Sequence, residues 1–78
     1  MQPELTQITD INEADIIELV NGETKDFTAG KMYEVKVDDG SIFGVENERY
    51  TIDDTYVANT EMFYSPHLEL KYYKKISE

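Results

Sequence analysis

The stretch that decides the fold is Lys31-Met32-Tyr33-Glu34-Val35-Lys36-Val37. Its side chains alternate, because Tyr33, Val35 and Val37 fall on one face and Met32, Glu34 and Lys36 fall on the other. Alternation with a period of two is typical of a β-strand that buries one face. Asp38-Asp39-Gly40 follows directly, and aspartate before glycine favours a tight turn. The stretch therefore predicts a strand that enters a turn.

The segments that follow carry similar signals. Residues 49–52 alternate again, and in residues 67–76 three apolar side chains share one face. Residues 41–46 predict a short apolar strand in which Gly44 marks a bulge or a bend. Two segments predict loops: a polar one at residues 22–30, and one with a helical turn at residues 53–66.

Residues 12–20 allow two interpretations. As a helix, the segment would begin after Asn12 with acidic residues in its first turn and would end at Asn21-Gly22. As a strand, it is a run rich in β-branched residues that ends in Asn-Gly, a strong turn signal. The strand is favoured because the segments that follow predict β-structure. An α+β fold with residues 12–20 helical is the alternative.

Four or five short strands with closely spaced turns predict a mainly β fold. Antiparallel strands of this length leave exposed edges unless the sheet curls on itself, so a small SH3-like antiparallel barrel is the economical arrangement. We expect one domain over residues 13–78, preceded by a flexible acidic arm over residues 1–12. The predicted core consists of Ile17, Leu19, Phe27, Tyr33, Val35, Val37, Phe43, Val45, Ile52, Leu70 and Tyr72.

The charge of the chain limits the classes of partner. Seventeen acidic residues against seven basic ones give a net charge of −10 over 78 residues. Such a protein is repelled by nucleic acid backbones and anionic membranes, so direct binding to either is not expected. It is attracted to basic proteins, which include many that bind DNA or RNA. The chain shows neither a signal-peptide pattern nor an apolar run of membrane-spanning length, so we expect a soluble cytoplasmic protein.

Patterns for catalysis and metal binding are weak. Cysteine is absent and His67 is the one histidine, which excludes thiolate zinc sites and multi-histidine metal sites. Neighbouring carboxylates such as Asp38-Asp39 fit a hairpin turn better than an acid–base pair, because a domain of this size has little room for a substrate cleft. We therefore expect no enzyme activity, no catalytic residue, no metal site and no cofactor.

Acidic residues are concentrated toward the start of the chain, where residues 1–24 contain six acids and no base. Rows of carboxylates at a density near that of DNA phosphates could occupy a basic groove on a partner. Exposed tyrosines among them would add contact area at a low entropic cost. The candidate partner-binding residues are Glu13, Asp15, Glu18, Glu23, Asp26, Asp38, Asp39, Tyr56 and Tyr73.

A family resemblance adds to this interpretation. The motif Gly30-Lys31-Met32-Tyr33-Glu34-Val35, the Asp-Asp-Gly turn and the segment at residues 49–52 resemble the small SH3-like proteins of bacteriophages of Gram-positive hosts. The resemblance covers residues 14–52 and implies an SH3-like fold and a phage origin. It implies no catalytic residues, since that family shares none. The chain departs from the family pattern in its acidic front and after Asp53.

The favoured hypothesis is a non-catalytic, phage-encoded inhibitor that mimics the charge of nucleic acid. Its partner would be a basic host protein that binds DNA or RNA, such as a nucleoid protein, RNA polymerase or a nuclease, in the cytoplasm of the bacterial host. The alternative is a structural module that self-associates, for example as a homodimer, or docks on another phage protein. Salt distinguishes the two, because charge mimicry is screened and apolar contacts persist.

Overall fold

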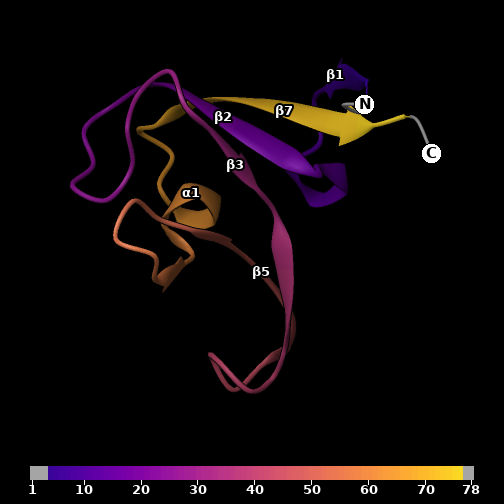
Figure 1. The fold of residues 1–78 in the computed structure, drawn as a ribbon, viewed down its shortest axis with the longest axis vertical. Coiled ribbons are helices and arrows are strands. Elements are labelled where there is room, and N and C mark those ends of the chain that lie inside the picture. Colours follow the sequence, from indigo (N-terminus) through magenta and orange to yellow (C-terminus); the bar gives the residue numbers. More distant parts are fainter. Residues whose placement is uncertain (1–3, 77–78) are drawn as a thin grey trace.

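The computed structural model describes residues 4–76 and shows a mainly β protein. Two antiparallel sheets and one short helix make up the fold (Figure 1). None of the helices in these residues is long and apolar enough to cross a membrane. The elements are β1 (Leu5–Ile8), the 3-10 turn η1 (Ile11–Glu13), β2 (Ile16–Asn21), β3 (Met32–Glu34), β4 (Lys36–Asp39), β5 (Glu46–Ile52), β6 (Ala58–Asn59), α1 (Glu61–Tyr64) and β7 (Glu69–Lys75).

The larger sheet has the strand order β1-β7-β2-β3. Strand β2 confirms the strand interpretation of residues 12–20, and helical geometry is confined to the short turn η1 before it. Ile17 and Leu19 alternate along β2 and are both fully buried. Burial of alternate β-branched and leucine side chains against the rest of the core makes β2 the central element of this sheet.

The expected separate arm is wrong for the residues next to the domain. Leu5–Ile8 form β1, which pairs antiparallel with β7 in a register that puts Leu5 opposite Lys75 and Ile8 opposite Tyr72. Ile8 also packs against the core. Pairing with the last strand satisfies backbone groups that an arm would leave to water, and no local sequence signal announces it. Residues 1–3 lie outside the described part of the chain.

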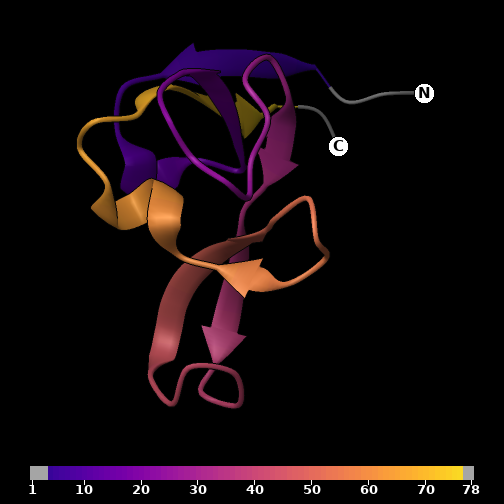
Figure 2. The same ribbon diagram turned by 90° about the vertical axis from the view of Figure 1, so that its left-hand side faces the viewer.

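The smaller sheet has the order β4-β5-β6. Strands β3 and β4 are consecutive parts of one extended segment that leaves the first sheet and enters the second at Val35. The mainly β prediction is confirmed, but the two sheets do not close into a barrel within residues 4–76. The β4–β5 hairpin instead extends away from the larger sheet, as both ribbon views show (Figures 1 and 2).

The predicted strand at residues 41–46 is wrong, because β5 begins only at Glu46 and the preceding residues form bends. The physical reason is the side chain of Asp38, which is 2% exposed. Its carboxylate accepts hydrogen bonds from the backbone N–H groups of Gly40, Ile42 and Phe43 at 2.8–3.1 Å. Those donors are therefore unavailable to a strand ladder, and the segment forms a loop.

The core lies between the larger sheet, the loop at residues 22–31 and α1. Of the predicted core, Ile17, Leu19, Phe27 and Tyr33 are buried, and Val35, Leu70 and Tyr72 pack partly buried against them, while Ile52 is half-buried outside that cluster. Ala14, Met62 and Leu68 belong to the core as well. The prediction is wrong for Val37, Phe43 and Val45, which are 53%, 39% and 57% exposed. All three lie on the projecting hairpin, where no second layer covers them.

Candidate functional site

The acids of the first segment lie beside the lysines of the last strand. Because β2 pairs with β7, Glu18 is opposite Lys71 in the register, and its carboxylate accepts a hydrogen bond from the Tyr73 hydroxyl at 2.9 Å. The Asp15 carboxylate accepts from the backbone N–H of Lys75 at 2.8 Å. These two carboxylates are therefore engaged in hydrogen bonds within the fold and lie beside a strand that carries lysines, although the sequence around them contains no base.

Glu13 follows the same pattern, since its carboxylate lies 3.9 Å from the Lys74 ammonium group. Glu23 and Asp26 lie elsewhere, on the loop between β2 and β3, where they help to line an open hollow with Asn59 and Glu61. The structure thus divides the predicted acidic row between the β2–β7 surface, this loop and the hairpin, and it does not bring the row onto one face.

The two predicted contact tyrosines differ in their surroundings. Tyr56 is 89% exposed in the turn between β5 and β6 and has a positive φ of 66°. Tyr73 is half-buried on β7, and its hydroxyl donates to Glu18. That hydrogen bond raises the pKa of the Tyr73 hydroxyl, because it stabilises the protonated form beside an anion. Of these two tyrosines, Tyr56 is the one that presents nearly its whole side chain to solvent.

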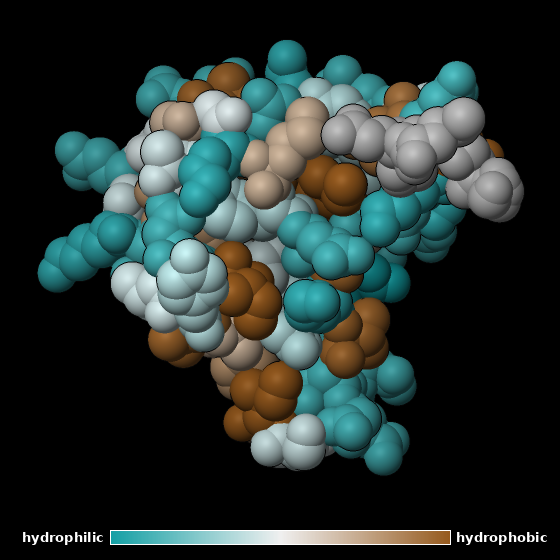
Figure 3. All heavy atoms as spheres, in the orientation of Figure 1, coloured by the Kyte–Doolittle hydropathy of each residue, from teal (hydrophilic) through white to brown (hydrophobic). Residues whose placement is uncertain are grey.

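The most prominent exposed apolar group lies on the β4–β5 hairpin. Val37, Ile42, Phe43 and Val45 expose between 39% and 57% of their surface. We call these four residues the hairpin patch. Hydrophobic side chains interrupt the polar surface along the projecting part of the molecule (Figure 3). Single exposed apolar residues are ordinary, but a cluster on one projecting element is typical of an interaction surface.

The loop that carries most of the hairpin patch is tied by hydrogen bonds to the buried carboxylate of Asp38. Burial alone would raise the pKa of Asp38, but its three backbone N–H donors outweigh that effect and hold the pKa below its usual range. Asp38 is therefore an ionised positioning residue rather than the exposed contact that the sequence predicted. Gly40 and Gly44 adopt positive φ angles of 100° and 82°, which side chains rarely adopt. Phe43 packs edge-on against Tyr50 at 5.8 Å between ring centroids.

Carboxylates flank the hairpin patch. Asp39 and Glu46 are register partners across β4 and β5, and both side chains are exposed. Like charges directly opposite each other in a sheet are destabilising, so this pair adds nothing to the fold. The carboxylate of Asp39 accepts a hydrogen bond from the backbone N–H of Ser41 at 3.0 Å, and the polar groups of Ser41 hold the pKa of Asp39 below its usual range. The hairpin thus combines exposed apolar side chains with unpaired negative charge.

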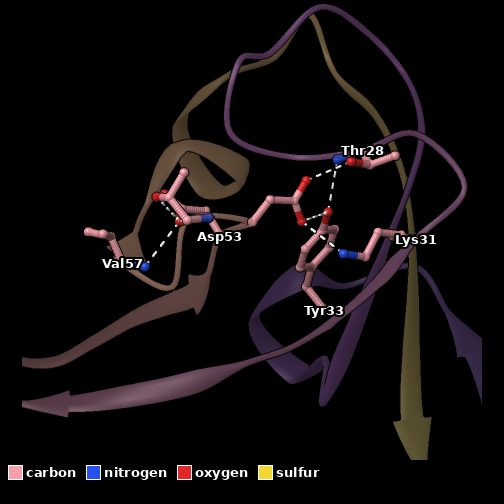
Figure 4. Close-up of polar contacts among 7 residues, drawn as sticks. Thr28, Lys31, Tyr33, Asp53 and Val57 are labelled. Carbon is pink, nitrogen blue, oxygen red and sulfur yellow. Dashed lines mark hydrogen bonds and ion pairs between the residues drawn. The ribbon is translucent and has the colours of Figure 1, made fainter.

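A second buried aspartate holds the turn between β5 and β6 (Figure 4). Asp53 is 6% exposed and accepts hydrogen bonds from the backbone N–H groups of Thr55 and Val57, the Thr55 hydroxyl and the Asn59 amide at 2.7–3.1 Å. Burial opposes ionisation, but these donors outweigh it and lower the pKa of Asp53 to about 2. The turn is a rigid structural element.

The neighbouring Asp54 joins this turn to Thr28, Lys31 and Tyr33, which lie close together (Figure 4). Its carboxylate accepts from the Thr28 hydroxyl at 2.6 Å, the Tyr33 hydroxyl at 2.9 Å and the Lys31 ammonium group at 3.0 Å. These hydrogen bonds hold the pKa of Asp54 below its usual range. Each group of the cluster is already paired, so the cluster tethers two loops and offers no free acid or base.

The described residues contain no group of three or more histidine or carboxylate side chains arranged to hold a metal ion. The sequence did not predict the hairpin patch, because a short run of apolar residues is typical of a buried strand. A signal was nevertheless present: two glycines within residues 40–44 interrupt that stretch and favour a loop over a strand. The chain matches no protein-family model, and comparison with curated proteins and with solved structures finds no match.

Proposed function

We propose that this chain is a non-catalytic protein-binding domain that contacts a basic partner through the β4–β5 hairpin. One observation carries the proposal: four exposed apolar residues lie on a projecting element whose loop is fixed by the buried Asp38 carboxylate. A loop that is already ordered loses little conformational entropy on binding. The apolar hairpin side chains do not pack in the core, so their burial can stabilise an interface with a partner.

The net charge of −10 supports a basic partner, and proteins that bind DNA or RNA form a large class of basic proteins. A phage-encoded inhibitor of such a host protein therefore remains our proposal for the biological role. We assign the contact to the hairpin and its carboxylates rather than to Glu13, Asp15 and Glu18, because those three lie among the lysines of β7.

Two matched variants test the proposal. Val45 on the hairpin is 57% exposed and Val57 in the turn after β5 is 56% exposed. Val45→Ser and Val57→Ser remove equally exposed apolar groups, so they should affect stability alike. In capture from bacterial lysate with quantitative mass spectrometry, we expect a basic protein that is recovered by the wild type and by Val57→Ser but is lost with Val45→Ser. Equal recovery by all three proteins contradicts the proposal.

Competition and salt define the nature of the contact. We expect DNA or RNA to compete for the captured protein, and recovery to fall as salt is raised, since exposed carboxylates attract through screened charges. The alternative of a self-associating structural module also draws on the exposed hairpin patch. Sedimentation velocity distinguishes it, because self-association of a chain with a charge of −10 should strengthen as salt screens the repulsion.

A further inference from the structure

The outer edge of β4 carries an inference about how the hairpin binds. On the larger sheet, the backbone N–H of Val35 donates to the Asp15 carbonyl at 2.9 Å, and the Leu19 N–H donates to the Lys31 carbonyl at 3.1 Å. Residues 31 and 35 therefore direct their backbone groups toward β2. Because this direction alternates with a period of two, the N–H and C=O of Val37 point to the same side of the segment.

That side is open at Val37. Strand β2 begins at Ile16, and the chain before it turns away through η1, so β2 does not extend alongside β4. Strand β5 lies on the opposite side of β4, where Lys36 pairs with Tyr50. Among the described residues, no hydrogen bond that joins two backbone groups involves residues 36–45 outside the β4–β5 pairing. Figures 1 and 2 show the hairpin extending away from the other elements.

We propose that the open edge of β4 accepts an extended, basic segment of a partner protein as an additional strand. The backbone of Val37 supplies the hydrogen bonds, and its 53% exposed side chain contacts an apolar residue of the added strand. The inference rests on the proposed function, and it adds the mode of binding and the chemistry of the recognised segment.

The carboxylates of Asp39 and Glu46 favour a basic residue in the added strand. Asp39 lies two residues beyond Val37 and faces Glu46 across the hairpin. The β4–β5 register shifts between Val37 and Asp39, but both side chains are exposed and that of Asp38 between them is buried, so Val37 and Asp39 share one face. A lysine or arginine two positions from the apolar residue would therefore reach this carboxylate pair. The same cation would remove the repulsion between Asp39 and Glu46. The recognised segment is thus an extended stretch with an apolar residue and a basic residue two positions apart.

The probe is the capped peptide Thr-Lys-Thr-Val-Thr-Lys-Thr, titrated into the full chain and followed by NMR. Val37→Pro removes the outward N–H and leaves the β4–β5 hydrogen bonds in place, which an edge strand tolerates. Val37→Thr keeps that N–H and changes only the side chain. We expect Val37→Pro to weaken binding at least about tenfold and Val37→Thr to weaken it no more than about threefold.

A second measurement holds even if Val37→Pro destabilises the protein. A peptide N-methylated at every residue has no backbone N–H to donate on either edge, so it cannot complete a β-ladder and should not bind the wild type. Equal binding of both peptides, no binding of the unmodified peptide, or equal losses with the two Val37 variants overturns the inference. A wild-type dimer that Val37→Pro dissociates would assign the edge to a second copy and also overturns it.

The outcomes separate this inference from the proposed function. If Val45→Ser abolishes capture of the basic protein while Val37→Pro leaves it unchanged, the hairpin binds a partner and strand addition is wrong. If neither variant changes capture, both proposals fail. If both variants abolish capture and Val37→Thr retains it, the partner is bound through the backbone edge of β4.

Discussion

In β2, Ile17 and Leu19 expose none of their surface, whereas on the β4–β5 hairpin Val37 and Val45 expose more than half of theirs. Both regions carry apolar side chains in an antiparallel strand or directly beside one, with Val37 in β4 and Val45 just before β5. They differ in what lies opposite, since β2 is enclosed by β7, β3 and the core, and the hairpin extends beyond that layer. Apolar side chains that a second layer covers, as on β2, stabilise the fold. Apolar side chains that no layer covers, as on the hairpin, are available to bind a partner.

The largest expected effect is a loss of folding stability when a buried side chain of β2 is shortened. Ile17→Ala removes a fully buried side chain and should lower the free energy of unfolding by about 3 kcal/mol. Val37→Ala removes a side chain that is already 53% exposed and should lower it by less than about 1 kcal/mol. Urea unfolding followed by circular dichroism measures both. Similar losses for the two variants would mean that the hairpin is part of the stabilising core.

The next largest effect concerns the buried carboxylate of Asp53, which holds the turn beyond the hairpin strand β5. Asp53→Asn weakens a cluster of four donors and should cost about 2 kcal/mol near pH 7. Folding lowers the pKa of Asp53 from 3.8 to about 2, so its contribution is present above pH 4 and is lost as the pH falls toward 2. The stability difference between the wild type and Asp53→Asn should therefore shrink over that window in thermal unfolding. A difference that stays constant from pH 5 to pH 2 contradicts this assignment.

The smallest effect is a gain. Thr51 on β5 is fully buried, and its hydroxyl has no hydrogen-bond partner among the described residues. Thr51→Val replaces that hydroxyl with a methyl group of similar size and should raise the free energy of unfolding by about 1 kcal/mol. Thr55→Val is the control with the opposite sign, because the Thr55 hydroxyl donates to Asp53 at 2.7 Å. A loss of stability in Thr51→Val would show that its hydroxyl is satisfied in solution.

Several elements of the fold could be predicted from local sequence. Alternation identified the stretches that became β3, β4, the end of β5 and β7, and a run rich in β-branched residues identified β2. The helical turn expected within residues 53–66 is α1. These predictions succeed because side-chain periodicity and turn chemistry act over a few neighbouring residues. The strand prediction for residues 41–46 was wrong because a contact from outside the segment overrides its own apolar pattern. Its apolar pattern is local, but the carboxylate of Asp38 that prevents a strand is three or more residues away.

The candidate site was less predictable than the fold. The sequence placed Asp38 among the contact residues, and it is instead a buried acceptor that shapes the loop. It placed Glu13, Asp15 and Glu18 in a segment without bases, and the pairing of β2 with β7 brings Lys71, Lys74 and Lys75 beside them. Charge along a chain does not predict charge on a surface when distant strands pair.

By itself, the sequence determined that this is a mainly β protein with a net charge of −10 and no cysteine. These properties follow from the residue types and from the side-chain periodicity, both of which are local features of the sequence. Only the tertiary structure decided that Leu5–Ile8 join β7, that N-terminal acids lie beside C-terminal lysines, and that the apolar hairpin residues stay exposed. The physical reason is that strand pairing joins residues far apart in the sequence, such as Leu5 and Lys75, which are 70 positions apart. Backbone hydrogen bonds between strands are similar for all residue types, so the local sequence does not specify which strands pair.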